Sequence, residues 1–105
     1  MVPIQSLDEF YSLISDNDVA VLLVKTNGCS VCDAVEQQLE DGAVEDPEVP
    51  AVRIKLEDVP EFSGEYLVFS APTVLLFIEG KEYWRGSRFV RFDEMNQMIS
   101  SYKAE

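Results

Sequence analysis

The chain has 105 residues, 47% of them hydrophobic, and 20 acidic against 8 basic side chains give it a net charge of −12. This length suits one domain, expected over residues 1–105, and the hydrophobic fraction excludes a disordered polar chain. The acidic excess argues against nucleic acid and anionic membrane surfaces as partners, because their phosphates would be repelled. No apolar run reaches the ~18 residues that span a bilayer, and residues 1–9 lack the features of a secretory signal, so the expected location is the cytoplasm.

The first half of the chain predicts a helix, a buried strand and a second helix. Residues 6–9, Ser-Leu-Asp-Glu, have the form of a capping box, and the apolar residues after them recur at helical spacing, which predicts a helix over about 7–16. Residues 19–24 are apolar on both faces, as expected of a strand that is covered by helices on both sides. After a break at 26–28, apolar residues at three- and four-residue steps predict a helix over about 30–40.

The second half predicts two more strand regions and two more helices. Residues 52–56 alternate between apolar and charged, which indicates a strand with one wetter face, and a short helix is expected over 58–66 with Pro60 in its first turn. Residues 74–78 form a strongly apolar strand, residues 82–85 a short hairpin partner that Gly86 ends, and residues 91–102 a last helix. This order predicts an α/β fold in which a central mixed sheet of four to five strands carries helices on both faces.

The only two cysteines, Cys29 and Cys32, lie three positions apart where the first buried strand gives way to a helix. Free backbone N–H groups at a helix N-terminus stabilise a thiolate and lower a cysteine pKa from about 8.5 towards roughly 3.5–7.5. This placement favours a redox-active pair over two inert thiols. A structural zinc site needs four Cys or His ligands, and this chain has no histidine, so a zinc ion would require ligands from another chain and no metal is expected.

Together with two later features, the dithiol resembles the thioredoxin family. Ala71-Pro72-Thr73 stands just before the strand at 74–78 and is similar to the family's cis-proline loop, and Glu79-Gly80-Lys81 is similar to its hairpin turn. The resemblance runs over most of the chain and implies a thioredoxin-like fold. It also implies that Cys29 is the nucleophile, Cys32 the resolving thiol, Pro72 the cis-proline and Ala71 a backbone contact to substrate. The expected substrate site further includes Gly28, Ser30, Val31 and, as an apolar rim, Phe69.

Several positions depart from the family pattern. Gly28 replaces a usual tryptophan, and Ser30-Val31 replaces a common Gly-Pro pair. Leu23 stands where a buried aspartate usually assists proton removal from the second thiol, and Arg53 stands at about the position of that aspartate's lysine partner. The residues considered as substitutes for the missing acid are Glu57, Asp33 and Lys25.

Two functions remain open from the sequence. The first is a thiol–disulfide oxidoreductase that reduces protein or small-molecule disulfides, takes electrons from a thiol reductase or a small thiol, and needs no bound cofactor. The second is a thioredoxin-fold binding or chaperone-like module whose dithiol is vestigial or regulatory. The pKa of Cys29 distinguishes them, because a value near 8.5 favours the module and one well below about 7.5 the enzyme.

Overall fold

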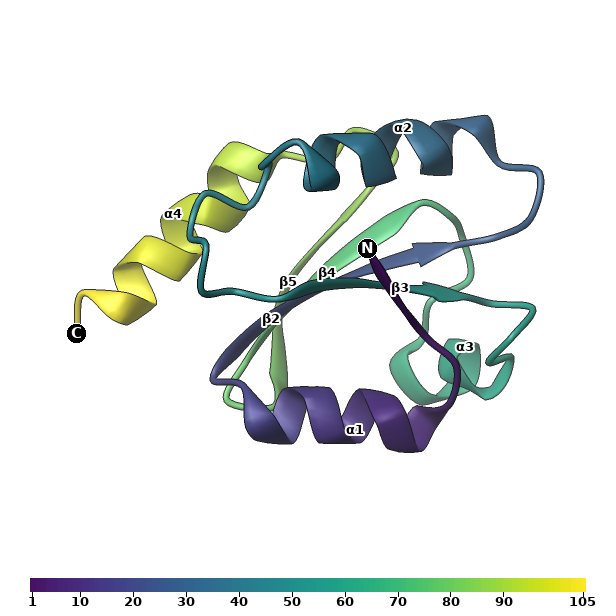
Figure 1. Cartoon of the computed structure of the whole chain (residues 1–105), viewed down its shortest axis with the longest axis horizontal. Helices are drawn as coiled ribbons and strands as arrows, with labels where there is room; N and C mark the ends of the chain where they lie inside the picture. The colour runs from purple at the N-terminus through teal and green to yellow at the C-terminus, as the bar shows by residue number, and fades with distance from the viewer.

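All 105 residues are described by a computed structural model, which is built around a five-stranded mixed sheet (Figure 1). The strands are β1 (Val2–Ile4), β2 (Val19–Lys25), β3 (Ala51–Lys55), β4 (Thr73–Ile78) and β5 (Lys81–Ser87). The helices are α1 (Leu7–Asp16), α2 (Ser30–Glu40), α3 (Glu61–Tyr66) and α4 (Phe92–Lys103). The strand order is β1-β3-β2-β4-β5, in which β1, β3 and β2 are parallel while β4 and β5 each pair antiparallel with the preceding strand of the sheet. None of the helices combines the length and apolar character that crossing a membrane requires.

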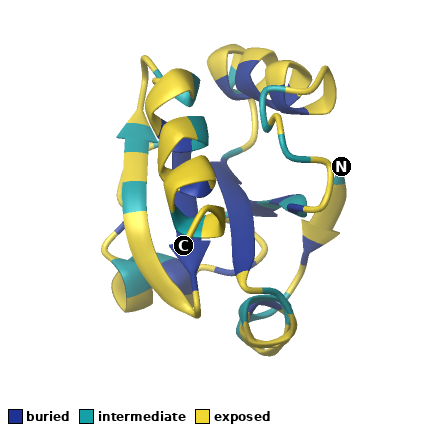
Figure 2. Cartoon of the chain, turned by 90° about the vertical axis from the view of Figure 1, so that its left-hand side faces the viewer, coloured by how far each residue is buried: buried dark blue, intermediate teal, exposed yellow.

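The sheet separates two apolar layers, and the central strand β2 contributes to both. Leu22 and Val24 pack with Phe10 of α1 and Phe62 of α3 on one face. The alternate residues of β2, such as Leu23, pack with residues of α2 and α4 on the other face. Figure 2 shows the central strands as buried and the outer surfaces of the helices as exposed. The predicted α/β fold, with a mixed sheet covered by helices on both faces, is therefore confirmed.

The start of α1 follows its sequence signal closely. Ser6 is the N-cap, and its Oγ accepts a hydrogen bond from the Glu9 backbone N–H at 3.1 Å. The Glu9 carboxylate accepts from the N–H of Gln5 at 3.4 Å, one residue before the cap itself. These two contacts satisfy backbone donors around the start of the helix, which explains why its start is predicted correctly.

Three local predictions differ from the structure. The strand β1 was not expected, because three residues that include Pro3 carry no readable alternation; pairing with β3 orders them. The helix expected over 58–66 begins only at Glu61, with Pro60 as its N-cap, because residues 56–58 form a turn after β3. Gly86 lies inside β5 opposite Val74 instead of ending the strand. A Cβ at Gly86 would come within 2.9 Å of the Trp84 ring, so glycine admits the indole there.

Candidate active site

The two cysteines occupy the junction between β2 and α2, as predicted. Cys29 is the N-cap of α2 and is partly exposed, whereas Cys32 lies one turn into the helix and is completely buried. The two residues are joined by a disulfide, with their Cα atoms 5.2 Å apart. Cys29 Sγ accepts a hydrogen bond from the Cys32 backbone N–H at 3.1 Å. Because this donor is one of the unpaired N–H groups of a helix N-terminus, it stabilises negative charge on Cys29 Sγ.

The turn before the dithiol explains the glycine at position 28. Residues 27 and 28 form a turn, and Gly28 has a φ of 69° in the left-handed region that glycine adopts without steric cost. A hydrogen bond from the Asn27 N–H to the Glu57 carboxylate, at 3.1 Å, ties this turn to the loop after β3. The Thr26 hydroxyl donates to the same carboxylate oxygen. Glu57 thus holds the turn and is itself exposed.

A second segment approaches the dithiol from β4. Thr73, the first residue of β4, is paired with Val24, so Ala71 and Pro72 lie at the same end of the sheet as the segment that leads to Cys29. The Ala71–Pro72 peptide bond is cis, as the sequence resemblance implies. Pro72 is buried and Ala71 partly exposed. The structure therefore brings Ala71 and Pro72 to the end of the sheet where Gly28, Ser30 and Val31 flank the cysteines.

Exposed apolar side chains occur in three segments at this end of the molecule. Val31 is 54% exposed and Phe69 is 75% exposed. Phe89, which sequence reasoning missed, is 90% exposed. It follows Arg88, whose backbone N–H donates to the Pro72 carbonyl at 3.5 Å. A phenylalanine in a short loop between a strand and a helix carries no periodic signal, so only the hydrogen bond to Pro72 identifies its location.

A cluster of charged side chains lies between α2 and the adjacent strands. Lys25 Nζ donates to Glu36 Oε1 at 2.5 Å and to Asp33 Oδ1 at 3.1 Å. The other Glu36 oxygen accepts from the Arg53 guanidinium. Lys25 and Glu36 are each 7% exposed and are the only charged residues of the chain that are buried. Two of the three residues considered for the missing acid, Lys25 and Asp33, thus belong to the cluster, whereas Glu57 lies in the turn contact described above.

Glu36 was not predicted as a site residue, although its position carried a signal. It follows Cys32 by four positions and therefore shares the buried face of α2. Burial by itself raises the pKa of Glu36, but hydrogen bonds from Lys25 and Arg53 outweigh it and hold this pKa below the ordinary 4.5. The pKa of Lys25 is raised, chiefly by its hydrogen bond to Glu36. Both side chains are therefore charged at neutral pH.

The lowered pKa of Glu36 makes part of the folding stability dependent on pH. A group whose pKa is lower in the folded than in the unfolded state contributes stability above its unfolded pKa and loses it as the pH falls through the folded value. The difference in unfolding free energy between the wild type and Glu36→Gln should therefore be largest above pH 4.5 and shrink below it. Urea unfolding of both proteins at neutral and acidic pH measures this difference. A difference that stays constant down to acid pH would contradict the ionised state of Glu36.

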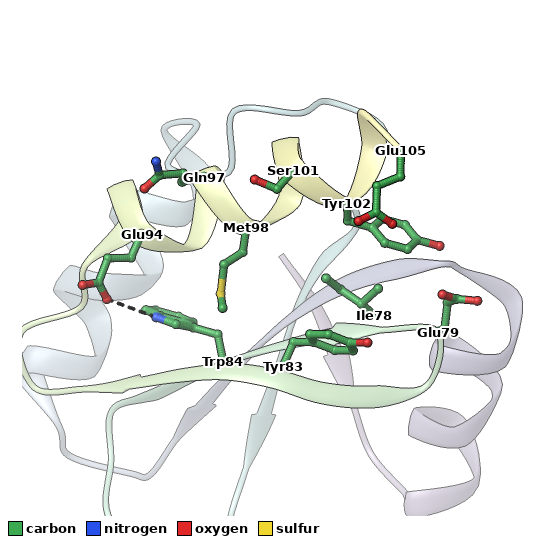
Figure 3. Close-up of a pocket in the computed structure, with 10 residues that line it drawn as sticks. All are labelled: Ile78, Glu79, Tyr83, Trp84, Glu94, Gln97, Met98, Ser101, Tyr102 and Glu105. Carbon is green, nitrogen blue, oxygen red and sulfur yellow. Dashed lines mark hydrogen bonds between the residues drawn. The ribbon is translucent and has the colours of Figure 1, made fainter.

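One hollow on the surface of the molecule does not contain the dithiol. A hollow of about 570 Å³ is found between β5 and α4, where Trp84, Tyr83 and Tyr102 contribute aromatic rings (Figure 3). The Trp84 indole donates there to Glu94 Oε1 at 3.3 Å. None of the residues 28–32 or 69–73 lines it. No group of three or more cysteine, aspartate or glutamate side chains is arranged to hold a metal ion.

Comparisons with known proteins give one consistent result. A family model described as a thioredoxin domain matches residues 18–100. A thioredoxin-like protein of Bacillus subtilis, YdfQ, is 33% identical over 99 residues, which cover 94% of this chain and 88% of that protein. The thioredoxin of Chlamydia trachomatis is 28% identical over 103 residues, covering 98% of this chain and all of that protein. Among solved structures, a mutant thioredoxin from Halobacterium salinarum superposes with a TM-score of 0.83 at 25% identity, covering 96% of this chain and 88% of that one.

A thioredoxin fold with two cysteines at disulfide distance defines a protein-disulfide oxidoreductase. The chain belongs to the thioredoxin family, as the family-model match and the 33% identity show. The resemblance predicted from the dithiol, the Ala71-Pro72 segment and the hairpin turn is thereby confirmed. Family membership implies, in general terms, protein substrates that carry disulfides and a partner that supplies or accepts electrons.

Proposed function

We propose that this oxidoreductase reduces disulfides of other proteins in the cytoplasm, with Cys29 as the nucleophile and Cys32 as the resolving thiol. The strongest support is the unequal exposure of the two cysteines. Cys29 is a partly exposed residue at the N-terminus of α2, whereas Cys32 is completely buried one turn further in. An incoming disulfide can therefore reach Cys29, while Cys32 is positioned to react only with a sulfur already bonded to Cys29.

In the first step, the Cys29 thiolate attacks one sulfur of a substrate disulfide. The substrate S–S bond breaks, a mixed disulfide to Cys29 forms, and the other substrate sulfur leaves as a thiolate that takes up a proton from water. The Cys32 N–H stabilises the attacking thiolate because it donates a hydrogen bond to Cys29 Sγ, and the positive end of the α2 dipole adds a favourable electrostatic interaction.

In the second step, the Cys32 thiolate attacks Cys29 Sγ. The mixed disulfide breaks, the Cys29–Cys32 disulfide forms, and the second substrate sulfur leaves. The substrate has then gained two electrons and two protons, and the enzyme has lost them. A thiol reductase or a small thiol must return the enzyme to its dithiol form before another cycle.

The substrate site that we propose surrounds the dithiol on an open surface. Gly28 and Ser30 border Cys29 in the chain, and Ala71 and Pro72 lie at the same end of the sheet. Val31, Phe69 and Phe89 expose apolar area that suits the apolar flanks of a protein substrate. A polypeptide fits such a surface better than a small enclosed molecule does.

The test is to trap substrates with Cys32→Ser. This variant keeps the nucleophile and lacks the resolving thiol, so mixed disulfides with a disulfide-containing protein should accumulate through Cys29. They are detected as bands that disappear on reduction in a non-reducing gel. The matched control, the double variant Cys29→Ser with Cys32→Ser, should trap nothing. If Cys32→Ser traps no more than this control and the wild type reduces no model disulfide, the chain acts as the binding module instead.

A further inference from the structure

A β-bulge brings two consecutive aromatic side chains of β5 to the hollow between β5 and α4. Leu76 of β4 is paired with Trp84 and Phe77 with Glu82, so Tyr83 is the extra residue of the bulge. In a regular strand Tyr83 and Trp84 would point to opposite faces of the sheet. Both line the hollow instead (Figure 3). Bulges are common next to functional sites, where they redirect a side chain.

The helix α4 completes the hollow with a thioether and a third aromatic ring. Met98 and Tyr102 are four residues apart and therefore lie on the same side of α4, and Figure 3 shows Met98 pointing towards β5. Tyr83 is 55% exposed and Met98 is 39% exposed, so part of this aromatic and apolar surface faces solvent. The volume of about 570 Å³ lies within the range of about 300–1,000 Å³ that ligand sites occupy.

The charged side chains of the hollow are all acidic. Glu79, Glu94 and Glu105 line it, and none of the lining residues is basic. Glu94 accepts a hydrogen bond from Trp84 Nε1 at 3.3 Å and lies 4.0 Å from the Arg91 guanidinium. Glu79 and Glu105 form no ion pair. Two carboxylates at the hollow are therefore available to a cation from outside the chain.

The side chains near these carboxylates do not neutralise them. Burial and the charge of Glu79 raise the pKa of Tyr102 above its ordinary 10.0, so this phenol stays neutral at physiological pH. Lys103, the next residue in α4, pairs with Asp46 at 2.7 Å. Lys81, two residues after Glu79, forms no ion pair with any carboxylate. The hollow thus keeps a negative charge beside its aromatic rings.

The hollow extends from the end of the sheet that lies opposite the dithiol. Ile78 lines the hollow and is paired with Val19, the first residue of β2. The other end of β4, at Thr73, is paired with Val24, and the chain continues from there to Cys29. A partner that binds in the hollow therefore leaves the dithiol accessible.

We propose that the hollow between β5 and α4 is a docking site for an arginine-containing basic segment of a partner protein. The arginine guanidinium stacks on the rings of Trp84 and Tyr83. Its methylene stem lies against Met98, and Glu79 and Glu105 neutralise its charge.

Charge complementarity selects this kind of partner. The net charge of −12 attracts a basic segment over a distance, whereas it repels the phosphates of nucleic acids and anionic membranes. Arginine fits better than lysine, because its planar group stacks on aromatic rings and also binds a carboxylate through two parallel N–H donors. A segment of several residues is expected, since the hollow is larger than one side chain requires.

The test uses the only tryptophan of the chain, Trp84, whose fluorescence reports directly on the hollow. The peptide acetyl-Gly-Arg-Gly-Arg-Gly-amide should change this fluorescence in a saturable manner. The same peptide with citrulline, which has a similar shape and no charge, should bind about tenfold more weakly. The lysine peptide should also bind more weakly than the arginine peptide. Added salt should reduce the affinity, because it screens exposed charges.

Variants that keep Trp84 test the residues of the hollow. Tyr83→Leu keeps apolar area but removes the exposed ring, and it should weaken binding about two- to fivefold. The double variant Glu79→Gln with Glu105→Gln should weaken binding about fivefold. Its matched control, Asp58→Asn with Glu61→Gln, removes two exposed charges beside α3 on the other face of the sheet and should leave the affinity unchanged.

Four results would overturn the proposal. The first is a Trp84 signal that does not saturate up to about 1 mM peptide. Equal binding of the citrulline peptide would indicate an apolar groove, and tetramethylammonium that binds as tightly as the peptide would indicate a site for a small organic cation. Equal weakening by the control variant would show that only the net charge matters. None of these measurements involves the thiols, so their outcome is independent of the proposed reductase activity.

Discussion

Replacing Cys29 with serine is expected to abolish disulfide reduction and to leave the fold intact. A serine hydroxyl is not ionised near neutral pH, so no thiolate remains to attack a disulfide. Serine is, however, among the best helix N-caps, and its Oγ can accept the Cys32 N–H that Cys29 Sγ now accepts. Insulin reduction in the presence of a small dithiol should fall to the uncatalysed rate, while the thermal unfolding midpoint should match that of the reduced wild type.

The comparison must use the reduced protein, because the Cys29–Cys32 disulfide of the oxidised form is absent from the variant. Cys32→Ser is the partner control: it should also lose turnover yet keep a Cys29 thiol that iodoacetamide alkylates rapidly at neutral pH. Residual turnover by Cys29→Ser above the uncatalysed rate would mean that Cys32 can attack substrates itself. The assignment of the nucleophile would then be wrong.

Truncating Phe10 to alanine is expected to produce the largest loss of stability among single changes outside the dithiol. Phe10 is completely buried in the layer between α1 and the sheet. Its ring makes edge-to-face contacts with Phe62, Tyr66 and Phe77 at centroid distances of 5.0–5.4 Å. Removing a buried phenylalanine ring costs about 3–5 kcal/mol, a large part of the roughly 5–15 kcal/mol by which a domain of this size is stable.

Urea unfolding followed by circular dichroism measures this loss. Tyr11→Ala is the matched control, because Tyr11 is next to Phe10 in the chain but is 38% exposed. Its truncation removes mainly a surface hydrogen bond from the Tyr11 hydroxyl to Glu65. It should cost less than about 1 kcal/mol. Equal losses for the two variants would show that the aromatic cluster around Phe10 does not hold α1 and α3 on the sheet.

The charge cluster also bears on the departures from the family pattern. Leu23 is completely buried opposite Arg53, so no acid is available in β2 at that point. The buried carboxylate of this protein comes instead from Glu36 of α2, the helix that covers this face of the sheet. It forms ion pairs with both Arg53 and Lys25. A sequence position that lacks an acid therefore does not mean that the site lacks one.

Features that depend only on neighbouring residues can be read from the amino-acid sequence alone. The helix over 7–16, the buried strand after it and the dithiol at the start of the next helix all follow from periodicity, capping and spacing. The position of Ala71-Pro72 before a strand was equally readable. These features are local, because the periodicity of apolar side chains, about two residues in a strand and about 3.6 in a helix, can be recognised within a single element.

Contacts between side chains that are distant in the sequence depend on how the elements pack in three dimensions. The strand β1 exists through its pairing with β3, and Phe89 reaches the active-site end through the bond between Arg88 and Pro72. Glu36 meets Lys25 from 11 positions away and Arg53 from 17, on three different elements. The physical reason is that burial and pairing of charges depend on how elements pack against each other, which no local repeat encodes.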